Sequence, residues 1–193
     1  MDTAIPQWAD KDLSLALPKI CEGGEGSRCD FKVTFPDQSH RLGKLIAAFA
    51  TSGGGDIFIG VDDSGTIVGI DGDTADKRDD MIERGQNIAR TVAPPPIVKF
   101  QYAIHEVKVV LVVRVGKQQA PVYYHEQRPY VREGSQARPA RPEEVVDLVC
   151  ASAAHRRRRV IKKRRHFLRR PDDRIPPEHS IVIRYIVVHA RRQ

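Results

Sequence analysis

Residues 48–63 read AFATSGGGDIFIGVDD, and this stretch decides the fold. Apolar residues recur at helical spacing over 41–52, and the three glycines that follow end this predicted helix, as glycines at helix C-termini commonly do. The short apolar run at 56–61 is typical of a buried strand, DDSG at 62–65 predicts a tight turn, and 66–70 is the predicted hairpin partner. We therefore expect helices packed on a sheet.

The sequence on both sides of this stretch predicts further elements of the same kinds. In chain order they are an amphipathic stretch at 8–20, a strand at 29–35, a helix at 75–92 that three prolines end, strands at 97–104 and 107–115, a hairpin pairing 122–124 with 130–132, and a helix from Pro142. The predicted fold class is α+β, with a mixed, mostly antiparallel sheet, two or three helices and a basic C-terminal extension.

The charge of the chain is concentrated at its C-terminal end. Residues 1–150 carry 18 lysines and arginines against 22 acidic residues, whereas residues 151–193 carry 14 against 3. The change in composition falls near 151–158, where four consecutive arginines begin a basic run: Arg156, Arg157, Arg158 and Arg159. Such a run favours contact with phosphates, although solubility, packing or a protein partner are alternative uses.

Composition excludes several classes of protein. With 40% hydrophobic and 30% charged residues, the chain has the composition of a folded domain and not of a disordered one. No apolar run approaches the roughly 18 residues that span a bilayer, so we expect no membrane contact and a cytoplasmic protein. The three cysteines are unclustered and no histidine has zinc-finger spacing, so the sequence predicts no zinc site.

Several blocks of sequence occur in an order that resembles a known family. The first block joins Glu25 to the DFK sequence at 30–32; the second is the stretch at 48–63; later blocks are VVLVVRV, PVY at 121–123 and YVREGS at 130–135. Together they resemble the AlbA-type domain of the Schlafen family, found in bacterial regulators and in the nuclease core of animal Schlafen proteins. The resemblance implies an N-terminal segment at 1–17, an AlbA-type domain at 18–150 and the extension at 151–193.

The resemblance also implies a set of catalytic acids. Glu25, Asp30 and Asp63 match the nuclease acids of the animal Schlafen proteins, although the family has Glu where Asp30 stands and Asn where Thr51 stands. Three such carboxylates would hold Mg²⁺ or Mn²⁺ for hydrolysis of a phosphodiester, which makes a metal-dependent endoribonuclease one hypothesis. The alternative is structural: Asp63 lies in a turn that favours aspartate, and Glu25 lies in a glycine-rich loop.

Nucleic-acid binding without catalysis is the leading hypothesis, including the role of a transcription regulator. The expected contacts on the body are Lys32, Arg132, Arg138 and Arg141, with the arginines at 156–159 on the extension. A third hypothesis is nucleotide (ATP) binding, in which Gly53, Gly54 and Gly55 would cradle a phosphate; a helix cap is the alternative role of these glycines. The expected partner is DNA or RNA, and small AlbA-type domains often work as homodimers. The three histidines at 40, 105 and 125 are scattered in the sequence and suggest no hydrolase triad.

Overall fold

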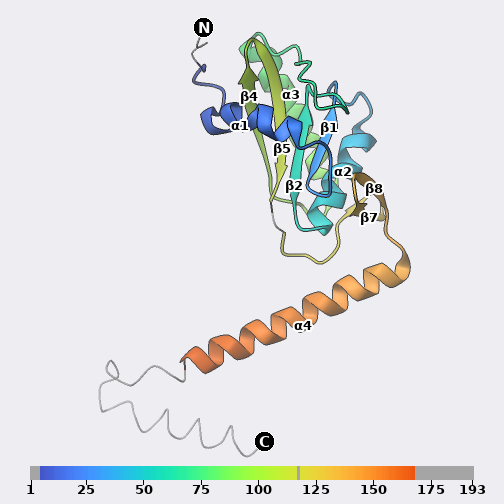
Figure 1. Cartoon of the computed structure of the whole chain (residues 1–193). Coiled ribbons are helices and arrows are strands. Elements are labelled where there is room, and N and C mark those ends of the chain that lie inside the picture. The colour runs from blue at the N-terminus through green and yellow to red at the C-terminus, as the bar shows by residue number, and fades with distance from the viewer. Residues whose placement is uncertain (1–4, 117, 168–193) are drawn as a thin grey trace, which may run out of the picture. The chain divides into compact units, whose positions relative to one another are not determined.

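The computed structural model describes residues 5–116 and 118–167, with the backbone alone over 156–167 (Figure 1). The elements in chain order are α1 (Lys11–Glu22), β1 (Cys29–Lys32), α2 (Ser39–Thr51), β2 (Gly55–Ile59), α3 (Ala75–Arg90), β3 (Val92–Ala93), β4 (Val98–His105), β5 (Lys108–Val115), β6 (Tyr124–His125), β7 (Arg128–Glu133), β8 (Gln136–Pro139) and α4 (Pro142–Phe167). The fold is α+β, as predicted.

The first sheet has the strand order β1-β2-β5-β4, in which β1 and β2 are parallel and the other pairs are antiparallel. The predicted pairing of 97–104 with 107–115 is confirmed by β4 and β5. The hairpin predicted after β2 is wrong in part. The turn forms, with the Gly65 N–H donating to the Asp62 carbonyl, but a single bridge from Val61 to Ile67 follows it and β5 is the antiparallel neighbour of β2. Within 66–70, Ile67 and Ile70 are partly buried against the two core clusters, whereas Val68 is exposed.

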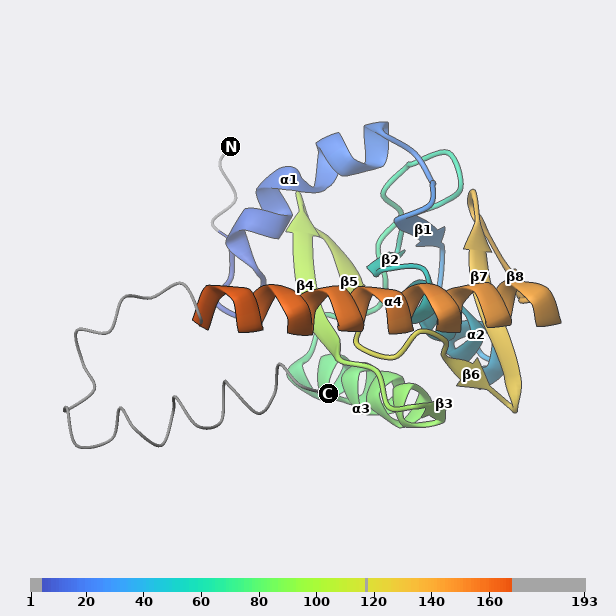
Figure 2. The same ribbon diagram turned by 90° about the horizontal axis from the view of Figure 1, so that it is seen from below.

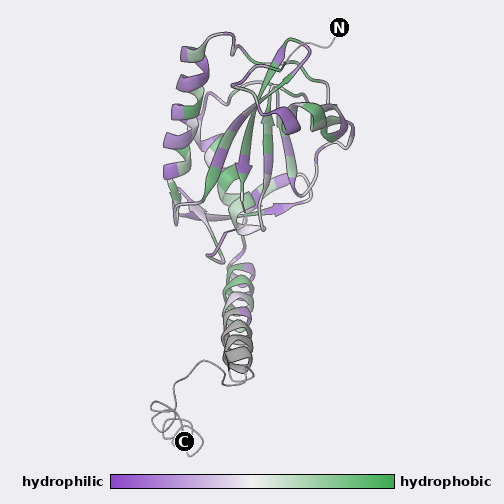
Figure 3. Cartoon of the chain, turned by 90° about the vertical axis from the view of Figure 1, so that its left-hand side faces the viewer, coloured by the Kyte–Doolittle hydropathy of each residue, from purple (hydrophilic) through white to green (hydrophobic). Residues whose placement is uncertain are grey.

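Helices cover both faces of this sheet, and the strand residues alternate between them. Phe31 and Phe58 pack edge-to-face on the side of α1, in one core cluster with Leu17. Ile57 and Ile59 lie in the other cluster, with residues of α2 and α3. Figure 2 shows α1 and α3 on opposite sides of the strands. In Figure 3, α3 at the left is largely hydrophilic, whereas the central strands carry many hydrophobic residues.

The second sheet has the order β3-β6-β7-β8 and is antiparallel throughout. The predicted hairpin is confirmed, because β6 pairs with β7 across a two-residue turn at Glu126 and Gln127. Both turn residues have left-handed backbone angles, with φ of 49° and 62°, as a type I′ turn requires. The strands β3 and β8 were not predicted.

The helix α4 begins at Pro142, where the sequence predicted it. The Glu144 carboxylate accepts the Arg141 N–H at 2.8 Å, which satisfies a free donor at the helix start. Hydrogen bonds from Arg138 lower the pKa of Glu144 to about 2. The helix continues to Phe167 and so includes most of the basic run, while residues 168–193 lie outside the described part.

The chain divides into two units between Ser152 and Ala153, inside the span of α4. The domain bounds expected from the sequence stay a prediction. Over the described residues, no helix combines the length and the apolar character that crossing a bilayer requires.

Candidate functional site

Two of the three predicted acids lie close together, Asp30 on β1 and Glu25 in the loop before it. One oxygen of Glu25 accepts the Phe31 N–H at 2.6 Å, which holds the glycine-rich loop against the strand. The Lys32 ammonium lies 2.6 Å from Asp30 Oδ1 and 3.9 Å from Glu25 Oε1. A cation therefore already stands between the two carboxylates.

Asp30 also forms a buried ion pair with Arg132. The guanidinium Nη1 lies 2.6 Å from Asp30 Oδ2, and the side chains of Arg132 and Asp30 are only 1% and 3% exposed. The second amino group of Arg132 donates to the carbonyl of Gly26 at 2.8 Å, and the guanidinium stacks over the Phe49 ring at 4.4 Å. Arg132 is thus a structural residue that joins β7 to β1, and it is not placed for the predicted contact with nucleic acid.

The third acid, Asp63, is exposed in the turn after β2. Its neighbour Asp62 organises that turn, since Asp62 Oδ1 accepts the N–H groups of Ser64 and Thr66 at 2.9 and 2.8 Å. The turn lies against the end of α1, because a Cβ on Gly65 would stand 2.3 Å from the Cys21 carbonyl. Asp63 and the loop that carries Glu25 are therefore at the same end of the sheet.

This arrangement does not fit a Mg²⁺ or Mn²⁺ site. Both oxygens of Asp30 face cations, and the carboxylate oxygens of Glu25, Asp30 and Asp63 do not all lie within 4.8 Å of one another. Divalent cations of this class need several oxygen ligands at about 2.0–2.6 Å from the ion. The catalytic and metal-binding roles of the three acids stay predictions.

The glycines at 53–55 connect α2 to β2. The Gly54 N–H donates to the Phe49 carbonyl at 2.8 Å, which caps the helix end. Gly54 has φ of +94°, and a Cβ there would lie 2.6 Å from the Val115 carbonyl. A Cβ on Gly55 would lie 2.3 Å from the ring of Phe49. The capping and the close packing account for glycine at 54 and 55, and binding of phosphate by this loop remains a prediction.

The other predicted basic residues differ in whether their charges are paired within the fold or exposed to solvent. Arg138 binds both oxygens of Glu144 at 2.7 and 2.8 Å and also pairs with Glu133, so its charge is used within the fold. Arg141 is exposed, and the side chain of Lys32 is 37% exposed. The arginines at 156–159 lie on α4, where the backbone alone is described.

A model of the Schlafen AlbA_2 family matches residues 25–141, which is more than half of the chain. The chain belongs to this family. Membership suggests a function related to nucleic acid. Among solved structures, the DIP2311 protein from Corynebacterium diphtheriae is similar, with 19% identity and a TM-score of 0.45; the match covers 72% of this chain and 28% of that chain. No curated protein matches the chain.

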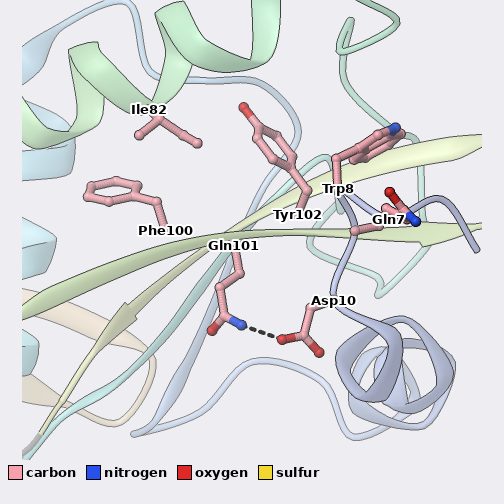
Figure 4. A pocket seen from close by; sticks show the side chains of 8 residues that line it. Gln7, Trp8, Asp10, Ile82, Phe100, Gln101 and Tyr102 are labelled. Carbon is pink, nitrogen blue, oxygen red and sulfur yellow. Dashed lines mark hydrogen bonds between the residues drawn. The ribbon is translucent and has the colours of Figure 1, made fainter. Parts of the chain in front are cut away.

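This Schlafen AlbA_2 domain also has a hollow that the sequence did not indicate. The segment that precedes α1, the helix α3 and the strand β4 line it, with the residues Gln7, Trp8, Ala9, Asp10, Ile82, Phe100, Gln101 and Tyr102 (Figure 4). The Trp8 ring meets Tyr102 edge-to-face, with centroids 6.1 Å apart, and Arg78 stacks on its face at 4.0 Å. The one signal in the sequence was Trp8 itself, the only tryptophan of the chain.

A buried histidine is the second feature of this domain that sequence reasoning missed. His125, at the end of β6, is 3% exposed, and burial lowers its pKa below the usual 6.5. The nearby His40 acts in the same direction, while Glu126 opposes it. His125 is therefore neutral at pH 7.

The depressed pKa of His125 predicts acid sensitivity. The unfolded chain takes up this proton at a higher pH than the folded domain, so the free energy of unfolding should decrease as the pH falls below the usual value of 6.5. Urea unfolding in EDTA at about pH 7.5 and about pH 5.5 measures the loss. This loss of unfolding free energy should be smaller in His125→Gln than in the wild type, and it should be unchanged in His105→Gln. An equal loss in wild type and His125→Gln would contradict the prediction.

Proposed function

We propose that this chain binds nucleic acid and that the basic segment of α4 makes the phosphate contacts. The observation that carries the proposal is the position of the basic run within a helix that starts at the AlbA_2 domain. Residues 156–165 contain eight lysines and arginines in ten positions. A helix presents such charges at regular spacing to the phosphates of a nucleic acid.

The charge of the domain supports assigning the contacts to this segment. Residues 1–150 carry more acidic than basic residues, and Arg132 and Arg138 are held in ion pairs. The domain would then provide position and selectivity, while the helix provides affinity. Family membership is the independent support, since it suggests a function related to nucleic acid.

Salt dependence of binding tests the proposal. Replacing the arginines at 156–159 with glutamine should weaken binding to duplex DNA or RNA at least tenfold. It should also reduce the slope of log K against log salt by roughly 0.9 for each duplex phosphate that is no longer neutralised, or about 0.7 for single strands. Mobility shifts at several salt concentrations, with duplex DNA, single-stranded RNA and tRNA, give both quantities.

The matched control removes four exposed positive charges elsewhere. Its substitutions to glutamine are at Lys11, Lys19, Lys99 and Arg128. The control should keep most of the affinity and the slope, because the loss depends on position and not on net charge. Equal losses in both quadruple variants would refute the assignment to α4, and absence of a salt-sensitive shift in the wild type would refute nucleic-acid binding.

The same reactions test the endoribonuclease hypothesis. They are run with Mn²⁺, with Mg²⁺ and with EDTA, and the length of the nucleic acid is followed beside its mobility. Metal-dependent cleavage that is lost in Asp63→Ala would establish the catalytic acids. Asp63 is the right position for this substitution because it is exposed, whereas replacing Asp30 also breaks a buried ion pair. Light scattering of the purified chain tests the predicted homodimer.

A further inference from the structure

Three potential metal ligands from distant parts of the sequence meet between α2 and the β6–β7 turn. They are His40 in the first turn of α2, His125 at the end of β6 and Glu126 in the turn itself. Their ligand atoms all lie within 4.8 Å of one another, and no other such group occurs among the residues whose side chains are described. His40 Nδ1 is 3.0 Å from Glu126 Oε2, and His125 Nε2 is 3.7 Å from Glu126 Oε1.

The hydrogen bonds of His125 leave one ring nitrogen free. The Thr91 hydroxyl donates its hydrogen to the Ile88 carbonyl at 2.7 Å, so Thr91 Oγ1 accepts from His125 Nδ1–H at 3.2 Å. The proton of the neutral ring is therefore on Nδ1, and Nε2 carries a lone pair. Nε2 is buried and has no hydrogen-bond partner. A buried acceptor that lacks a partner is costly, and a bound water or ion is the usual explanation.

The helix α2 is shaped to hold this ring. A Cβ on Gly43 would lie 2.4 Å from His125 Cε1 and 2.7 Å from Nε2, so any larger residue would displace the imidazole. Gly43 is three positions after His40, and the two residues therefore share one face of the helix. The same helix face thus supplies one ligand and the space for another.

We infer that His40, His125 and Glu126 bind one divalent transition metal ion, with Zn²⁺ the best match. Two imidazole nitrogens and one carboxylate oxygen are a usual ligand set for Zn²⁺. Tetrahedral ligands at about 2.0–2.1 Å from the ion are roughly 3.3–3.4 Å apart. The nitrogens of His40 and His125 lie 3.0 and 3.7 Å from different oxygens of Glu126, and one ligand atom from each of the three residues lies within 4.8 Å of the other two. The side chains of His40 and Glu126 are 43% and 62% exposed, which leaves a path for the ion.

An ion pair between His40 and Glu126 alone is the simpler interpretation of this cluster. It leaves the lone pair of His125 Nε2 without a partner in a buried position. A bound metal ion accounts for this lone pair, and Gly43 allows the ring to lie where it can reach the ion. The ion would tie the start of α2 to the β6–β7 hairpin, and so fix the second sheet on the helix that precedes β2.

Calorimetric titration with Zn²⁺ tests the site in the full chain. A Cys150→Ser background removes the exposed thiol as a competing ligand. The parent should bind Zn²⁺ at this site, and His40→Ala and Glu126→Gln should each weaken that binding more than tenfold. Gly43→Ala should also weaken it, by moving the ring of His125. The matched control His105→Ala should bind as the parent does, and Mg²⁺ should not compete because it prefers oxygen ligands.

Thermal unfolding gives a second readout that does not depend on any activity. At a Zn²⁺ concentration about 100 times the Kd, the midpoint of the parent should rise by roughly 5–10 °C over its value in EDTA. The rise should be absent in His40→Ala and Glu126→Gln, which replace exposed side chains and leave the fold intact. Equal Zn²⁺ affinity in the parent and these two variants, or no rise in the parent, would overturn the inference.

Discussion

Replacing Arg132 with methionine should lower the free energy of unfolding by about 3–5 kcal/mol, the usual cost of removing one partner of a buried ion pair. Methionine retains the packing over Phe49 but leaves one oxygen of Asp30 without its cation in a site that is 3% exposed. It also removes the hydrogen bond that the Gly26 carbonyl accepts from the guanidinium. Urea unfolding followed by circular dichroism measures the loss as a lower transition midpoint.

Two further variants make this prediction specific. Arg138→Met removes an arginine from partly exposed ion pairs with Glu133 and Glu144, and it should cost less. The double variant Arg132→Met with Asp30→Leu removes both charges, and it should recover part of the stability. A loss in Arg132→Met no larger than in Arg138→Met would show that burial does not set the strength of the first pair.

Gly54→Ala should have the second large effect, a loss of about 2–6 kcal/mol in the free energy of unfolding. The backbone at Gly54 has φ of +94°, where a residue with a Cβ is strained by roughly 1–3 kcal/mol. The new Cβ would also stand 2.6 Å from the Val115 carbonyl, and forcing a backbone shift adds roughly 1–3 kcal/mol. Thermal or urea unfolding measures the sum.

Gly53→Ala is the matched control, because a Cβ at this position causes the backbone strain without the steric clash. Gly53 has nearly the same φ, +93°, but the nearest atom to its Cβ position is an amino group of Arg28 at 4.0 Å. Its substitution should cost only the strain, about 1–3 kcal/mol. Equal losses at the two positions would mean that Val115 gives way easily. Because Gly53→Ala leaves the domain folded, it is also the variant in which to test ATP binding by this loop.

The main elements could be predicted because their apolar residues follow the period of the element. The helix α2 and the strands β2 and β5 are buried over most of their length, so the sequence shows an uninterrupted or periodic apolar pattern. The strands β3 and β8 have two and four residues, which is too short for a pattern to form. The segment at 66–70 has the composition of a strand, but a left-handed Gly69 precedes Ile70, which bridges to Val109 of β5.

The site was harder to predict because its contacts join distant residues. The sequence predicted Asp30 as a catalytic acid and Arg132 as a phosphate contact. The two side chains instead form a buried pair with each other, and they are 102 positions apart in the sequence. His40 and Glu126 are 86 positions apart, so no local spacing marks them as neighbours. The Thr91 hydroxyl bonds to Nδ1 of His125 and leaves Nε2 without a partner, and only the structure shows this contact.

The contacts around β1 have a further consequence for self-association. A strand at the border of a sheet presents unpaired N–H and C=O groups to which a strand of another molecule can add. On β1, the Phe31 N–H donates to Glu25, and the Cys29 carbonyl accepts from the Gly26 N–H and from Arg132. On β4 at the opposite border, the carbonyl of Tyr102 and the N–H of Ile104 bond to Asp10 and Ser14. The border at β1 and the part of the opposite border at Tyr102–Ile104 are thus closed to intermolecular strand addition.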